Sequence, residues 1–214
     1  MQYRQIEKKF YKNRLQVLCI FYAIIISVGV TLAILLSDDP RWMNWSLSRL
    51  GETSTNSLSA LSFNAGVFLS SLVMVAIGVF MTRSYSQLGQ RRSAQASGWL
   101  VASLTICMLG VALCPNDTMH AAHFFFSRGV VILMVVLMFV LPSSLSYLTH
   151  RERLLSFSFP VFVALLAMQG YLMGRWFWFV IIEVFLGIFA MVWLFLVCRR
   201  IDIKLADVKL HKML

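Results

Sequence analysis

Arg128 and Glu183 are the two full charges that lie inside long apolar runs of this sequence. Arg128 lies about seven residues into the run 122–145, and Glu183 lies about seven residues into the run 176–198. At about 1.5 Å of rise per residue, each lies roughly 10 Å below the same membrane face. Ionisable side chains are costly in hydrocarbon, so they pair with one another or line a wet cavity. We therefore expect these two residues to mark the functional site.

Three interpretations of the two charges stay open. In the first, Arg128 and Glu183 form a buried ion pair that fixes the register of two helices and does nothing else. In the second, they line a pocket near the outer face, where Glu183 orients Arg128 and the guanidinium binds a phosphate or carboxylate. In the third, the nearby Asp117, His120 and His123 activate water directly or through a metal.

The segment from Asp117 to His123 holds the candidate catalytic residues. Asp117, His120 and His123 are spaced three apart, so neighbouring members share a helix face. Asp117 and His123 diverge by roughly 120° on a helix of 3.6 residues per turn, so they could not both face one metal. Asp117 also follows Pro115 and Asn116, a position that fits the N-cap of a helix. We predict no metal site and no cofactor, and whether the protein is an enzyme stays open.

Polar residues of the expected spans gather in the outer third of the molecule, whereas the inner two thirds hold mostly Ser, Thr and apolar residues. The members of this outer group are Asn64, Asp117, His120, His123, Arg128, Gln169 and Glu183. The members that we assign to ligand binding are Arg128, Glu183, Asn64, His120 and Gln169. This distribution predicts a polar pocket in the outer half that binds or senses a lipid headgroup or another amphipathic ligand.

Six apolar runs must position these residues. The chain is 59% hydrophobic and 13% charged, about half the charged share of a soluble domain. Runs of about 20 apolar residues cross a bilayer, and backbone in lipid must satisfy its own hydrogen bonds, so the runs are expected to be helices. We predict an all-α fold in which residues 1–214 form a single transmembrane domain. Its six spans are expected near 15–36, 58–82, 97–113, 122–145, 154–173 and 176–198.

Basic residues lie mainly on one side of these spans. Fifteen precede the first span, follow the last one, or lie in loops 83–96 and 146–153, whereas the opposite loops hold only Arg41, Arg49 and Arg175. The positive-inside rule therefore predicts an inner-membrane protein with both termini in the cytoplasm. The net charge of +10 is then a topology signal that also attracts anionic lipid. The expected partners are membrane lipids and a membrane protein, and no nucleic acid.

Residues 37–57 form the longest connection between spans. Within it, Met43, Leu47 and Leu50 follow one another at i, i+4 and i+7. This spacing fits a short amphipathic helix at the outer interface. An irregular loop anchored by its tryptophans fits the same residues, so both interpretations stay open.

Three short segments and one histidine resemble the motifs of a bacterial six-helix membrane-protein family of unknown function: Leu47-Ser48-Arg49-Leu50-Gly51, Phe63-Asn64-Ala65-Gly66, Pro115-Asn116-Asp117 and His120. That family is similar to the damage-regulated autophagy modulators and to the membrane proteins that remodel GPI-anchor lipids. The resemblance implies a role with lipids or membrane stress. It marks four positions near the outer face, Ser48, Gly51, Asn64 and His120. The family pattern has an acidic residue after the serine, where this chain has Arg49.

The predicted function is therefore binding or sensing of an amphipathic ligand in the outer half of a helix bundle. One alternative is a membrane-embedded lipid hydrolase or transferase that uses the Asp and His residues of the outer face. Another is a non-catalytic partner subunit of a membrane complex.

Overall fold

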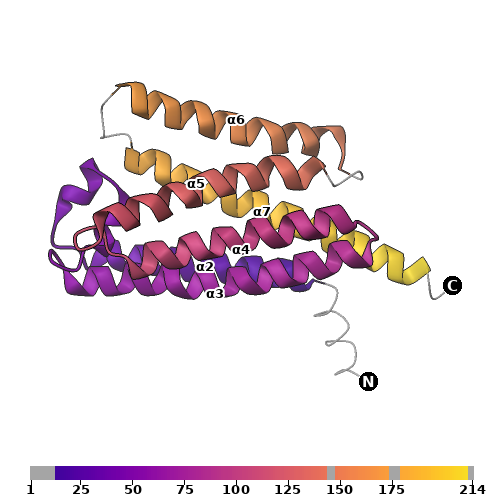
Figure 1. Ribbon diagram of the computed structural model, residues 1–214, viewed down its shortest axis with the longest axis horizontal. Coiled ribbons are helices and arrows are strands. Elements are labelled where there is room, and N and C mark those ends of the chain that lie inside the picture. Colours follow the sequence, from indigo (N-terminus) through magenta and orange to yellow (C-terminus); the bar gives the residue numbers. More distant parts are fainter. Residues whose placement is uncertain (1–12, 144–147, 174–178, 212–214) are drawn as a thin grey trace, which may run out of the picture.

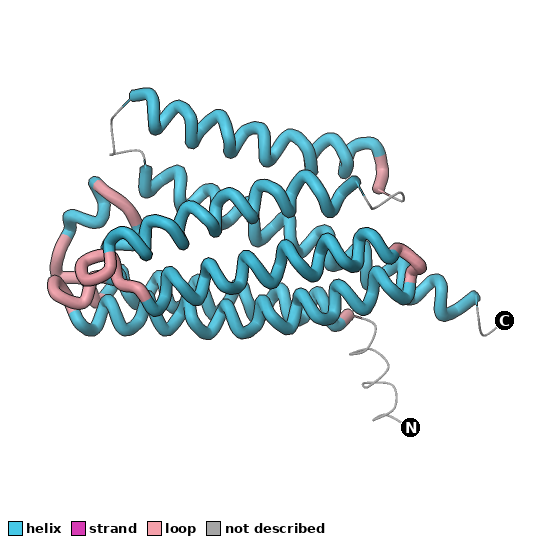
Figure 2. Tube along the Cα trace, in the orientation of Figure 1, coloured by secondary structure: helices cyan, strands magenta, loops and turns pink. Residues whose placement is uncertain are grey.

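The structure, a computed structural model, describes residues 13–143, 148–173 and 179–211, and every regular element in these ranges is a helix (Figure 2). Two 3₁₀ helices, η1 (Pro40–Asn44) and η2 (Leu47–Gly51), lie between the first two long helices. The all-α prediction is confirmed for this part of the chain, and each expected span coincides with a long helix. The long helices are α2 (Arg14–Leu35), α3 (Ser57–Gln87), α4 (Arg91–Leu113), α5 (His120–Ser143), α6 (His150–Met173) and α7 (Phe179–His211).

Five of these helices, α2, α3, α4, α5 and α7, are long and apolar enough to cross a membrane. At most 44% of the apolar window of any of them is buried inside the molecule. Many of the remaining apolar side chains are exposed on the outside of the bundle, where hydrocarbon accommodates them and water would not. The chain is a multi-pass membrane protein, and a sixth span at α6 stays a prediction.

The long helices run side by side along the long axis of the molecule (Figure 1). Helix α3 packs between α2 and α4, α5 packs on α4, and α7 returns to pack against α2. Helix α6 lies at the periphery, against α5 and α7 (Figure 1). We call the end that carries η1, η2 and the turn of residues 114–119 the cap end. Helix α2 begins and α7 ends at the opposite end (Figure 1).

Several helices extend beyond the predicted spans, and the longest extensions lie at the end opposite the cap. Helix α3 continues to Gln87, α4 begins at Arg91, and α7 continues to His211. With 33 residues, α7 is about 50 Å long at 1.5 Å per residue, whereas the hydrocarbon core is about 30 Å thick. Hydropathy marks where lipid ends, but helical hydrogen bonding continues into polar flanks.

The connection between α2 and α3 contains two separate 3₁₀ helices, so of its two open interpretations the single amphipathic helix over Met43, Leu47 and Leu50 is not what forms. Leu50 is buried at 2% exposure, but Met43 is 52% exposed, and the two do not share one apolar face. Ser59 explains why the connection folds back. Its hydroxyl lies 3.1 Å from the carbonyl oxygen of Leu50 and 2.9 Å from that of Ala33 at the end of α2. These contacts fix η2 against the ends of α2 and α3.

Candidate functional site

Glu52 joins the two connections of the cap end. It is buried at 7% exposure. Its Oε1 accepts a hydrogen bond from Nδ2 of Asn116 at 2.8 Å and lies 3.7 Å from Nε of Arg49. Because Asn116 donates through Nδ2, its Oδ1 accepts from Nδ1–H of His120 at 2.8 Å. A carboxylate, an amide and an imidazole thus form one chain across the cap, which leaves Nε2 of the exposed His120 as the acceptor nitrogen.

Neither Glu52 nor Asn116 is among the site residues predicted from the sequence. Both lie between spans, and Glu52 is 64 residues from its partner, so no local spacing connects them. The signal available was their position beside the segments that carry the family resemblance: Glu52 follows Gly51 directly, and Asn116 is part of Pro115-Asn116-Asp117.

Asp117 holds a turn of the neighbouring connection. Its Oδ2 accepts hydrogen bonds from the backbone N–H of Ser54 at 2.7 Å and from the hydroxyl of Thr53 at 3.1 Å. Desolvation raises the pKa of Asp117, but the hydrogen bonds from Ser54 and Thr53 outweigh it, so the pKa lies below its ordinary value of 3.8. Its bonds go to the Thr53–Ser54 turn, and α5 begins only at His120. Asp117 therefore links the connection that precedes α5 to the connection that precedes α3.

His123 is buried at 4% exposure on the first turn of α5. Its Nδ1 lies 2.8 Å from the carbonyl oxygen of Cys114, which can only accept, so Nδ1 carries the proton. Asp117, His120 and His123 therefore hold three different partners and do not act on one point. In the described part of the chain, no cluster of three or more His, Cys, Asp or Glu residues could hold a metal ion.

Asn64 closes the cap onto α3. Its Nδ2 donates to the carbonyl oxygen of Gly51 at 3.1 Å. A Cβ at Gly51 would lie 2.7 Å from Oδ1 of Asn64 and 2.9 Å from the ring of Phe63, so only glycine fits this contact. Two of the positions that the family resemblance marks, Gly51 and Asn64, thus touch each other and serve packing.

Arg128 and Glu183 do not form an ion pair, so the predicted contact between them is wrong. The guanidinium of the exposed Arg128 lies over the ring of Phe124, 3.7 Å from its centroid. The carboxylate of Glu183 accepts a hydrogen bond from the backbone N–H of Leu47 at 2.7 Å. Helix rotation explains the separation, because α5 turns Arg128 outward and α7 turns Glu183 into the bundle. Gln169 lies on α6, but its side chain is outside the described residues.

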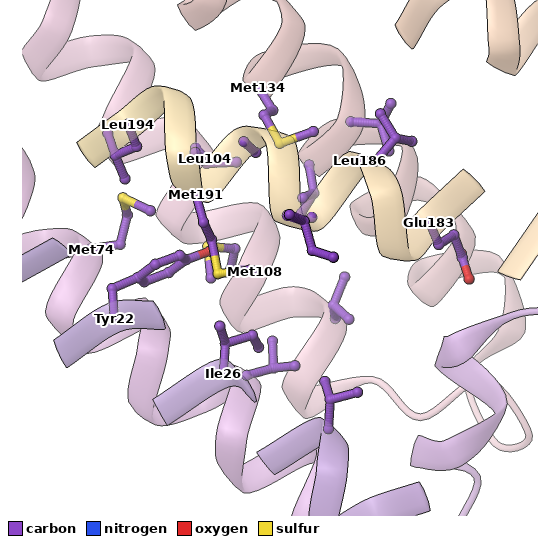
Figure 3. A pocket seen from close by; sticks show the side chains of 18 of the residues that line it. Tyr22, Ile26, Met74, Leu104, Met108, Met134, Glu183, Leu186, Met191 and Leu194 are labelled. Carbon is purple, nitrogen blue, oxygen red and sulfur yellow. The ribbon is translucent and has the colours of Figure 1, made fainter. Parts of the chain in front are cut away.

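An elongated cavity of about 480 Å³, open along part of its surface, lies between the helices of the bundle and is within the size range of small-molecule sites. Helices α2, α3, α4, α5 and α7 all contribute to its walls, and Leu47 and Ser48 of η2 line it at the cap end. Along α5 the lining extends from Ser127 to Leu141, a distance of about 21 Å at 1.5 Å per residue. Glu183 lies at the cap end of the cavity, apart from the apolar side chains deeper in it (Figure 3).

The deeper walls are apolar and adaptable. Four methionines contribute to them, Met74, Met108, Met134 and Met191 (Figure 3). Methionine side chains are flexible and polarisable, so they adjust to irregular apolar partners. Gly187 also lines the cavity, and a Cβ placed there would meet no atom within 4 Å. The site predicted as polar is therefore a mostly apolar cavity with one carboxylate at its end.

Residues 20–200 match the model of a family described as "Protein of unknown function (DUF998)". No curated protein and no solved structure matches the chain. The matched range contains the cap residues and every residue that lines the cavity. The match confirms the broader expectation of a membrane-protein family of unknown function. The narrower likeness to autophagy modulators and GPI-lipid-remodelling proteins has no support in these comparisons and stays a prediction.

Proposed function

The chain belongs to the DUF998 family of proteins of unknown function, and we propose that it binds an amphipathic molecule inside its helix bundle. The apolar chain of the ligand occupies the cavity, and its polar head lies at the cap end beside Glu183 and Ser48. The observation that carries this proposal is the elongated apolar cavity that ends at a carboxylate. Ligand clefts have volumes of about 300–1,000 Å³ and mostly apolar walls, so an apolar space of about 480 Å³ in a membrane protein suits a hydrocarbon chain.

The proposed orientation follows from charge. We place all six helices across the inner membrane, with both termini in the cytoplasm and the cap end outside. Arg91, Arg92, Arg199 and Arg200 lie at the end opposite the cap, where α4 begins and beyond the apolar part of α7. Positive residues favour the cytoplasmic side of a membrane, so this end supports the assignment.

Arg128 receives a different role from the one its depth alone suggests. It is exposed on α5 and does not line the cavity. A guanidinium on the lipid-facing side of a helix extends toward the interface, where phosphate groups are within reach. We propose that Arg128 contacts the headgroups of the lipids that surround the bundle.

Quenching of tryptophan fluorescence tests the proposal. Trp193 lines the cavity at 6% exposure, so a bromine on a bound chain should quench its emission. The probe is a neutral brominated monoacylglycerol added to the protein in nanodiscs, and the readout is the difference between wild type and Trp193→Phe. Gly187→Phe should fill the cavity and weaken the affinity read from this quenching about tenfold, a loss of about 1.4 kcal/mol.

Val192→Phe is the matched control, because Val192 lies on the same helix, is 48% exposed and does not line the cavity. It should bind the brominated chain as the wild type does. Equal quenching in wild type, Gly187→Phe and Val192→Phe would overturn the proposal, as would the absence of any quenching that depends on Trp193.

A lipid hydrolase or transferase is the second candidate, favoured by the chain from Glu52 through Asn116 to His120. A buried carboxylate that acts through an amide keeps the imidazole in one tautomer and leaves Nε2 available as a base. Purified protein would then turn over phospholipid, and His120→Ala would abolish the turnover. Asp117→Asn should retain it, because Asp117 bonds to a different turn. Equal turnover in wild type and His120→Ala would exclude this function for His120.

A further inference from the structure

Among the described residues that line the cavity, Glu183 is the only Asp, Glu, Lys, Arg or His, so this part of the lining supplies no cation to offset its charge. The other polar side chains near the cap end are hydroxyls such as Ser27, Thr31 and Ser48. A phosphate or carboxylate at this end would therefore face a like charge in surroundings that screen charge weakly. Arg128, which was expected at the same depth as Glu183, is on the outside of α5 and does not line the cavity.

Glu183 is also oriented for recognition. Its Oε2 is held by the backbone N–H of Leu47 at 2.7 Å, so the carboxylate is fixed against η2. Its Oε1 makes no hydrogen bond to any described residue and remains available to a donor. A carboxylate held in this way favours a cationic donor over a neutral one, because the attraction between opposite charges adds to the hydrogen bond in surroundings that screen charge weakly.

We propose that the cavity selects an amphiphile whose single apolar chain ends in a primary ammonium group, which donates to Oε1 of Glu183. This inference rests on the proposed function and adds the chemistry of the head. Selectivity has two parts: attraction of the ammonium by Glu183, and repulsion of an anionic head by the same carboxylate. The apolar walls bind the apolar chain of the ligand and do not distinguish one head group from another.

Three probes with the same brominated chain separate these contributions: an amine, an alcohol and a carboxylic acid. Each is titrated into the protein in nanodiscs of neutral lipid, and the Trp193-dependent quenching is read. The Gly187→Phe protein measures the part of each signal that comes from partition into the bilayer. The wild type should bind the amine about tenfold more tightly than the alcohol, and the acid most weakly.

Glu183→Gln is the decisive variant, because it keeps an oxygen that can accept from the N–H of Leu47 while it removes the charge. It should bind the amine and the alcohol about equally, because the preference for the amine comes from the charge of Glu183. Glu183→Lys should reverse the preference in favour of the acid. A lysophosphatidylethanolamine with the same chain tests whether a phospholipid head can supply the ammonium. Stronger quenching by the amine assigns the site to free amines, and equal quenching admits the phospholipid.

Equal affinities for amine and alcohol in the wild type would overturn this inference, as would an amine preference that survives Glu183→Gln. Failure of all three probes to quench Trp193 would overturn the proposed function itself. Quenching by the alcohol without any preference for the amine would overturn only the ammonium proposal, so the two failures are distinguishable.

Discussion

Gly66 and Gly187 show how differently two interior regions of this bundle are built. A Cβ on Gly66 of α3 would lie 2.8 Å from the Cα atom of Gly29 on α2, so the two backbones already touch. A Cβ on Gly187 of α7 would meet nothing within 4 Å. Small residues let transmembrane helices approach closely, and that explains Gly66. At Gly187 the lack of a side chain leaves open space, which supports its assignment to a ligand cavity.

The largest effect should come from Gly66→Ala. The added methyl group must push against the backbone of Gly29, which cannot rotate away, so α2 and α3 must separate. We expect a loss of about 2–3 kcal/mol in the free energy of unfolding, at the upper end for overpacked cores. Unfolding in mixed micelles with increasing denaturing detergent measures it. Gly98→Ala is the control, because its Cβ would lie 3.2 Å from the side chain of Thr82, which can move.

A Gly66→Ala protein as stable as the wild type would show that α2 and α3 separate without loss. The close contact between α2 and α3 at Gly66 would then not differ in packing from the cavity wall at Gly187.

The contrast between Arg128 and Glu183 shows what the sequence could predict here and what it could not. Their expected depth follows from counting residues into apolar runs, and five of the six predicted runs coincide with helices long and apolar enough to cross a membrane, because hydropathy depends on composition alone. Their direction depends on helix rotation. Side chains that face lipid and side chains that face the core are both apolar in a membrane protein, so the sequence has little periodicity that could fix rotation. Two charges at similar expected depth therefore turned out to point into different surroundings.

The cap was harder to predict for another reason. Its polar residues satisfy one another across connections that are far apart in the chain, as Glu52 and Asn116 do over 64 residues. Their position along the predicted spans indicated that four polar residues lie near one end of the bundle, and they do lie at the cap end: Asn64, Asp117, His120 and His123. Residues at the same end, however, need not form one site. Each of these side chains bonds to a loop or a helix end. Glu183, by contrast, combines a single bond to the cap with a place in the cavity wall.

Glu52→Leu should have the second largest effect and tests whether the cap is structural. The change removes the acceptor of Asn116 and leaves Arg49 without its carboxylate. We expect the free energy of unfolding to fall by about 2 kcal/mol, within the range for hydrogen bonds to charged groups. The same unfolding titration measures it. Glu52→Gln keeps an oxygen for Asn116 and should lose less, so equal losses in both variants would show that charge alone matters.

Gly187→Ala should have a smaller effect of opposite sign. The methyl group enters open space, and replacing glycine by alanine inside a helix favours folding by up to about 1 kcal/mol. The unfolding titration should therefore show a gain where Gly66→Ala shows a loss. Equal losses at both positions would indicate that the cavity wall is as closely packed as the contact between α2 and α3. The space that the proposed ligand needs would then be absent at Gly187.

The smallest effect is the loss of stability at low pH that depends on Asp117. The pKa of Asp117 is lowered below its ordinary value of 3.8, since hydrogen bonds from Ser54 and Thr53 outweigh desolvation. A lowered folded-state pKa means that the unfolded chain takes up the proton first as the pH falls. The stabilisation is therefore fully present above about pH 5 and is lost as the pH falls through the folded pKa. Unfolding temperatures measured over this pH range should decline more steeply for the wild type than for Asp117→Asn, which cannot titrate at this position.

The other carboxylates titrate in both proteins, so the difference between the two curves isolates Asp117. Parallel curves would show that the bonds of Asp117 to the Thr53–Ser54 turn do not stabilise the cap.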